Sequence, residues 1–82
     1  MKQNITQLVN AFLENKSSEE MSTFLKGILT SKELSELSTR LKIVKMLKQG
    51  ISQHKIAETL GVGVATVTRG SKELQQGRFE NV

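Results

Sequence analysis

The residues best suited to chemistry lie within or just after the segment 53–70, whose apolar spacing predicts two short helices joined by a turn. The outer face of the second helix keeps small, hydroxyl-bearing and basic residues: Ala65, Thr66, Thr68, Arg69 and Lys72. Small and hydroxyl side chains let a helix approach base edges in a major groove, and cationic side chains bind phosphates. This face therefore favours contact with nucleic acid, although the spacing also fits an ordinary helical hairpin.

The inner face of the same segment has the residue types that a helix-turn-helix requires. Ala57 is small enough for a second helix to cross directly over it. Gly61 can adopt the left-handed conformation that ends the first helix, at which a residue with a Cβ would lose about 1 kcal/mol or more. Four apolar side chains are expected to fill the wedge between the helices: Ile56, Leu60, Val62 and Val67.

Three amphipathic helices are predicted ahead of this segment. Asn4, Ser17 and Thr30 each stand three residues before a Glu or Gln, which is the capping pattern that opens a helix. Apolar residues at helical spacing follow each of them. In the third helix, expected to end near Gly50, the stripe comprises Leu34, Leu37, Leu41, Val44 and Leu47. Apolar residues also lie outside that stripe, so this helix needs more than one neighbour.

The length of 82 residues predicts a single all-α domain covering 1–82. We expect residues 1–50 to form dimerisation helices, 52–74 to form the helix-turn-helix, and 75–82 to form a flexible tail. A core of this size is thin, which favours a homodimer.

Composition excludes several classes of protein. The chain has no Cys and one His, so thiol catalysis and Cys- or His-rich metal sites are ruled out. No nucleophile–base pair or paired-carboxylate pattern is visible, and an enzyme is not expected. No apolar run approaches the length of about 20 residues that spans a membrane, so the expected location is the cytoplasm, with no membrane partner.

Positive charge is concentrated in the second half of the chain. Residues 1–39 carry four Lys and five Glu, whereas residues 40–82 carry eight Lys or Arg and three Glu, a net +5. This asymmetry points to a polyanion partner, and a solvated basic face with no partner is the alternative. The alternative function is that of a helical adaptor, which binds another protein through its third helix. The salt dependence of binding distinguishes a DNA-binding protein from such an adaptor, because DNA binding weakens steeply with salt.

Four stretches of the sequence resemble the Trp repressor family over about residues 29–74. They are residues 29–30, 39–44, 52–53 and, most specifically, the run GVGVATVTRGS at 61–71. The resemblance implies an all-helical, intertwined homodimer that binds operator DNA and represses transcription. It also implies a corepressor, L-tryptophan or another small molecule, bound between the dimer core and the helix-turn-helix. An effector-independent regulator remains the alternative.

The resemblance implies a ligand site at Thr30, Arg40, Arg69 and Gly70, which match the family's tryptophan-binding positions. Two guanidinium planes could sandwich an indole, and one could bind a carboxylate in bidentate fashion. The alternative roles are a surface cation for Arg40 and a phosphate contact for Arg69. Glu73 replaces a serine near the ligand's ammonium. It could bond that ammonium, or pair with Arg69 one helical turn away and occupy the carboxylate's place, and we favour the second.

The resemblance further implies DNA contacts at the start of the recognition helix, from Val64, Ala65 and Thr66, with Thr68 nearby. Gln53 matches a residue on the phosphate side of the family's interface. His54 stands where the family has a base-contacting arginine, which predicts a different sequence preference.

Overall fold

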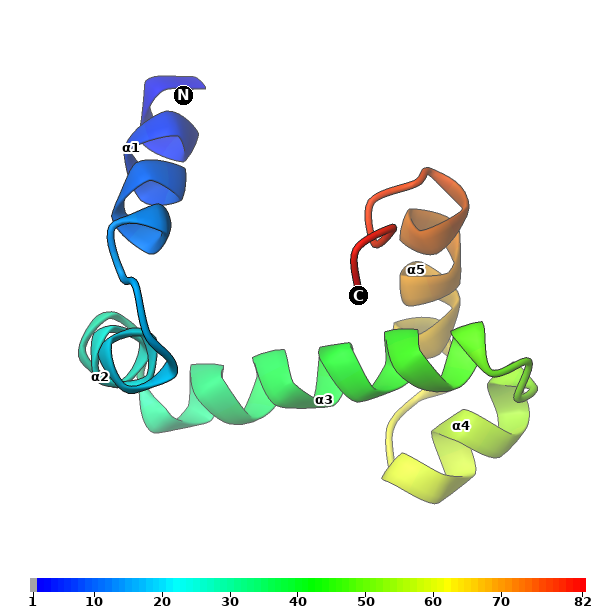
Figure 1. Ribbon diagram of the computed structural model, residues 1–82. Helices are drawn as coiled ribbons and strands as arrows, with labels where there is room; N and C mark the ends of the chain where they lie inside the picture. Colours follow the sequence, from blue (N-terminus) through cyan, green and yellow to red (C-terminus); the bar gives the residue numbers. More distant parts are fainter. Residues whose placement is uncertain (1) are drawn as a thin grey trace. The chain divides into compact units, whose positions relative to one another are not determined.

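Every regular element that the computed structural model describes, within residues 2–82, is an α-helix (Figure 1). Side chains are described from Asn4 onward. The helices are α1 (Lys2–Leu13), α2 (Ser18–Ile28), α3 (Ser31–Lys48), α4 (Gln53–Leu60) and α5 (Val64–Gln75). The expected all-α fold is therefore confirmed. The chain divides into two compact units, one up to Leu34 and one from Ser35 onward, and each is described by itself.

In the first unit, side-chain caps fix where α2 and α3 begin. The backbone N–H of Glu20 donates to Ser17 Oγ at 3.1 Å, and Glu20 Oε1 accepts from the backbone N–H of Lys16 at 2.7 Å. Thr30 and Glu33 form a reciprocal box, at 2.9 and 3.1 Å. These two predicted caps are confirmed, whereas the cap expected at Asn4 is wrong, because α1 begins at Lys2 and Asn4 lies inside it.

The first unit buries little apolar surface. The rings of Phe12 and Phe24 meet edge to face, with centroids 5.3 Å apart. Yet none of the side chains described in residues 4–34 is fully buried. Its large exposed apolar residues are Ile5, Leu8, Val9, Leu13 and Ile28. A helical pair of this kind gains too little from burial to offset the entropy of ordering its chain, so it requires another surface.

The second unit holds the core. Ile43 of α3, Ile56 and Ala57 of α4, and Val67 of α5 are all buried, and Ile56 and Val67 are completely inaccessible. Half-buried apolar side chains surround them: Met46, Leu47, Ile51, Leu60 and Val62. The wedge predicted between the helices is therefore confirmed. Its third side is the Ile43 face of α3.

Two glycines end the helices that lead into this core. Gly50 has φ +81° and Gly61 has φ +68°, a region in which a Cβ is strained. After α3, the N–H groups of Gly50 and Ile51 bind the carbonyls of Leu47 and Met46, at 3.0 and 3.2 Å. After α4, the N–H of Val62 binds Ala57 O at 3.1 Å in the same left-handed motif. Both predicted helix ends are thus confirmed to within two residues.

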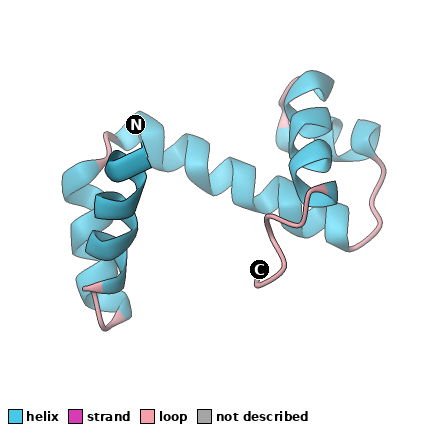
Figure 2. Cartoon of the chain, turned by 90° about the horizontal axis from the view of Figure 1, so that it is seen from above, coloured by secondary structure: helices cyan, strands magenta, loops and turns pink. Residues whose placement is uncertain are grey.

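The apolar stripe predicted for α3 is only partly covered. Val44 is buried and Leu47 is half-buried, but Leu37 and Leu41 remain 43% and 44% exposed. Residues 76–82, which follow α5, form turns rather than helix (Figure 2). The flexibility expected for residues 75–82 stays a prediction.

None of the helices within residues 2–82 is both long and apolar enough to cross a bilayer. In the same part of the chain, no group of three or more His, Asp or Glu side chains gathers where it could hold a metal ion.

Candidate nucleic-acid interface

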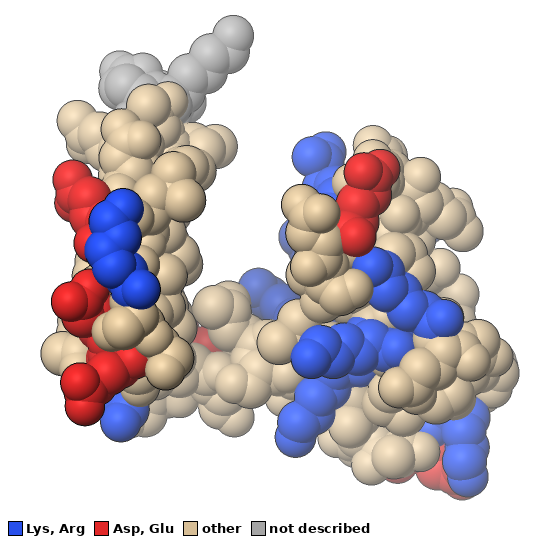
Figure 3. All heavy atoms as spheres, in the orientation of Figure 1, with Lys and Arg blue, Asp and Glu red and all other residues tan. Residues whose placement is uncertain are grey.

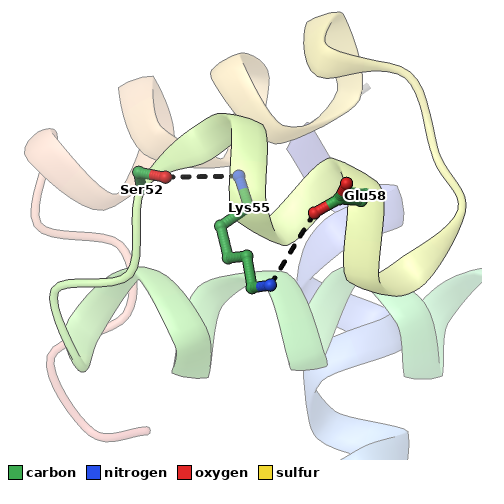
Figure 4. Close-up of polar contacts among 3 residues, drawn as sticks. All are labelled: Ser52, Lys55 and Glu58. Atoms are coloured by element: carbon green, nitrogen blue, oxygen red, sulfur yellow. Dashed lines mark hydrogen bonds and ion pairs between the residues drawn. The ribbon is translucent and has the colours of Figure 1, made fainter.

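The start of α4 is fixed by a side-chain cap. Ser52 Oγ accepts a hydrogen bond from the backbone N–H of Lys55 at 3.2 Å, as Figure 4 shows. The Lys55 ammonium also lies 3.7 Å from Glu58 Oε1, but both side chains are well exposed and the pair contributes little stability. The cap therefore defines the helix, and Lys55 keeps a solvent-facing positive charge.

A hydrogen bond joins the two helices of the helix-turn-helix. Thr68 Oγ1 of α5 donates to Gln53 Oε1 of α4 at 2.6 Å, and both side chains are half-buried. With Val67 and Ile56 packed in the same wedge, this bond fixes how α5 lies against α4. Gln53 and Thr68 thus have a structural role that sequence reasoning missed. The amide NH₂ of Gln53 stays available as a donor for an outside acceptor.

The other residues expected to contact DNA lie on the surface. Val64, Ala65 and Thr66 form the exposed first turn of α5, where no side chain caps the helix. The cations of this helix and His54 of α4 are exposed as well: Arg69, Lys72 and His54. The N–H of Thr66 donates to Gly63 O at 3.1 Å, within the turn itself. The first turn of α5 therefore offers small, exposed side chains next to cations.

Charge is distributed unequally between the units. The second unit carries eight Lys or Arg and four Glu, a net +4, and all eight cations are exposed. On the face drawn in Figure 3, Lys and Arg dominate the charged surface of the second unit. The charged surface of the first unit combines Glu with Lys. Such a surface attracts polyanions over about 8–10 Å at physiological salt.

A cavity of about 420 Å³ lies between α3 and α5. Its α3 wall is mostly apolar: it includes the buried Ile43 and Val44, together with Arg40. Its α5 wall is polar or small, and comprises Thr66, Arg69, Gly70 and Glu73. The remaining wall comes from Phe79 and Val82. The volume and mixed lining suit a small organic molecule that has an apolar body and an anionic group.

Comparison with known proteins agrees with this geometry. The family model described as Trp repressor protein matches residues 3–80. The chain is 39% identical over 74 residues to a Trp operon repressor homolog of Vibrio campbellii (strain ATCC BAA-1116), which covers 89% of this chain and 71% of that protein. It is 45% identical over 70 residues to a homolog of the same name from Photobacterium profundum, covering 84% and 68%.

The chain belongs to the Trp repressor family. This family comprises helix-turn-helix regulators rather than enzymes. The chain is also 34% identical over 73 residues to Uncharacterized protein YerC of Bacillus subtilis (strain 168), covering 89% of this chain and 70% of that protein.

Four of the five residues that the family resemblance assigns to a ligand line this one cavity: Arg40, Arg69, Gly70 and Glu73. Thr30 belongs to the first unit, where it caps α3. Gly70 also lets α5 lie close to α3, because a Cβ there would lie 3.1 Å from Ile43 Cγ2.

The ion pair expected between Glu73 and Arg69 is wrong. Glu73 Oε1 instead lies 2.6 Å from Nε of Arg78, in the turn that follows α5. Arg69 therefore keeps an exposed guanidinium beside the cavity, with no ion pair to any residue that the structure describes. Helical spacing favoured Arg69, but the reversal of the chain at Gly77 brings Arg78 back to Glu73.

Proposed function

We propose that this chain is a DNA-binding transcriptional repressor that acts as a homodimer and reads DNA with the first turn of α5. The observation that carries the proposal is the exposure of that turn on a rigid helix-turn-helix inside the cationic unit. Val64, Ala65 and Thr66 are short enough to let the helix backbone lie close to base edges. Arg69 and Lys72, and the amide of Gln53, would bind phosphates on either side.

The homodimer is part of this proposal because the chain leaves its apolar stripes uncovered. Leu8 and Val9 of α1 are 46% and 49% exposed, and Leu37 and Leu41 of α3 are 43% and 44% exposed. Stripes of this length on two helices exceed the scattered apolar residues of a normal monomer surface. A second copy of the chain would bury them and would set two recognition helices side by side.

A small-molecule ligand of the cavity stays a prediction. The Trp repressor family resemblance implies L-tryptophan, and Arg40 and Arg69 offer the guanidinium groups for stacking and for binding a carboxylate. Glu73, which replaces the family's serine, is occupied by Arg78 and does not compete for Arg69.

The wild-type protein should bind a random-sequence DNA duplex with strong salt dependence. If a dimer contacts about six to ten phosphates, log K should fall against log salt concentration with a slope of roughly −5 to −9. Fluorescence anisotropy of a labelled duplex over a range of salt concentrations measures this slope. A salt-independent complex, or no complex at low salt, would contradict DNA binding and would favour the protein-binding adaptor.

A further inference from the structure

Residues 76–82, here called the return segment, turn back from the end of α5 and are fastened to α3. The Lys48 ammonium, on the last residue of α3, donates hydrogen bonds to the backbone oxygens of Phe79 and Val82, the second at 2.8 Å. Figures 1 and 2 show this segment leaving α5 and reversing its direction. One side chain of α3 therefore holds the return segment at two residues that lie 31 and 34 positions later in the sequence.

The reversal itself is built into the sequence. Gly77 has φ +78°, and the N–H groups of Gly77 and Arg78 bind the carbonyls of Leu74 and Glu73, at 3.0 and 3.4 Å. A Cβ on Gly77 would lie 3.1 Å from a carboxylate oxygen of Glu80. The ion pair from Arg78 to Glu73 then holds the first residue after the turn against α5. The segment starts in one defined direction, toward the cavity.

The return segment reaches the cavity beside the recognition helix. Phe79 is half-buried, and together with Val82 it lines the cavity whose other walls are α3 and α5. The segment thus connects the C-terminal end of α5 to the C-terminal end of α3, past the cavity that separates the two helices. Anything that bridges these walls restricts how α5 can move relative to α3.

We propose that the return segment is an intramolecular tie that positions α5 for DNA binding, and that Lys48 is the positioning residue that fastens it. The inference rests on the proposed function. A segment of the same chain is always present at a high effective concentration. The return segment can therefore restrict the movement of α5 relative to α3, as a small molecule bound in the cavity would. It restricts the unit to the arrangement that contacts DNA, and the protein therefore binds DNA without an added effector.

Lys48→Met tests the tie on DNA. It should weaken the affinity for a DNA duplex about tenfold more than Lys45→Met, because a charge-assisted hydrogen bond is lost along with the charge. Lys45 is exposed on the same helix, makes no side-chain hydrogen bond or ion pair to the described residues, and measures the effect of charge alone. Lys48→Arg keeps the donors and should restore most of the affinity. Adding L-tryptophan to the wild type should change its affinity less than twofold.

A second readout follows the segment directly. The chain has no Trp or Tyr, so Phe79→Trp introduces a single fluorophore at the cavity. Its emission should be blue-shifted and protected from acrylamide, and adding Lys48→Met should make it red-shifted and accessible. Equal DNA affinities for Lys48→Met and Lys45→Met, or an indole that is solvent-exposed from the start, would overturn the tie. Loss of DNA binding in every protein, wild type included, would instead overturn the proposed function.

Discussion

A Leu41→Glu chain is expected to lose its folded state rather than to persist as a stable monomer. Leu41 is 44% exposed in the isolated chain, so a monomer would tolerate a carboxylate there. In the proposed dimer the same position is buried, and an unpaired carboxylate in an apolar interface costs several kcal/mol, out of a total stability of about 5–15 kcal/mol. The first unit, which has no fully buried side chain among those described, has little stability of its own to offset that cost.

Circular dichroism and light scattering measure the outcome. The wild type should be a helical dimer with one cooperative unfolding transition, whereas Leu41→Glu should show little helix. Ser35→Glu is the matched control, because Ser35 is exposed on the same helix and lies outside the apolar stripe. A well-folded, monodisperse monomer, from either the wild type or Leu41→Glu, would show that the apolar stripe is not a dimer interface.

Ala65→Glu should abolish DNA binding while leaving the protein folded. The side chain lies on the exposed first turn of α5, so a carboxylate there would face phosphates and base edges. Like charges brought together at an interface cost several kcal/mol, and a dimer would place two such carboxylates against the DNA. The affinity for DNA should therefore fall at least about 100-fold. In the free protein an acidic residue at a helix N-terminus is favourable by about 0.3–1 kcal/mol, so the melting temperature should stay equal or rise slightly.

This opposite behaviour of affinity and stability separates a DNA contact from a folding defect. Fluorescence anisotropy and thermal denaturation of the same preparations provide both values. Ser35→Glu adds the same charge away from α5 and should reduce affinity only by the small effect of net charge. If Ala65→Glu kept the full DNA affinity of the wild type, the first turn of α5 would not contact DNA.

The parts of the fold that could be predicted from the sequence depend on local interactions. Ser17, Thr30 and Ser52 cap their helices because a hydroxyl reaches a backbone N–H three residues ahead. Gly50 and Gly61 end theirs because only glycine adopts the left-handed conformation without strain. The packing of α4 against α5 could be predicted for the same reason, since Ile56 and Val67 are close in sequence.

The parts that could not be predicted depend on pairs that are distant in sequence or lack periodicity. The two contacts of Lys48 join residues that are 31 and 34 positions apart in the sequence. Residues 76–82 have no apolar periodicity from which their position could be predicted. Glu73 has a candidate cation one helical turn away, and only the turn at Gly77 decides that Arg78 is its partner. The hydrogen bond between Gln53 and Thr68 was missed because both residues are polar and were assigned to DNA.

The most direct test of the central claim is selection of bound sequences from a random duplex pool by the wild-type protein. Dimeric helix-turn-helix proteins, Trp repressor among them, read two half-sites whose centres lie about one helical turn, roughly 10–10.5 base pairs, apart. We predict that the enriched sequences share an inverted repeat with that spacing, and that Ala65→Glu enriches nothing. Absence of any enriched sequence, or recovery of the same sequences by Ala65→Glu, would contradict the assignment of α5 as the helix that reads DNA.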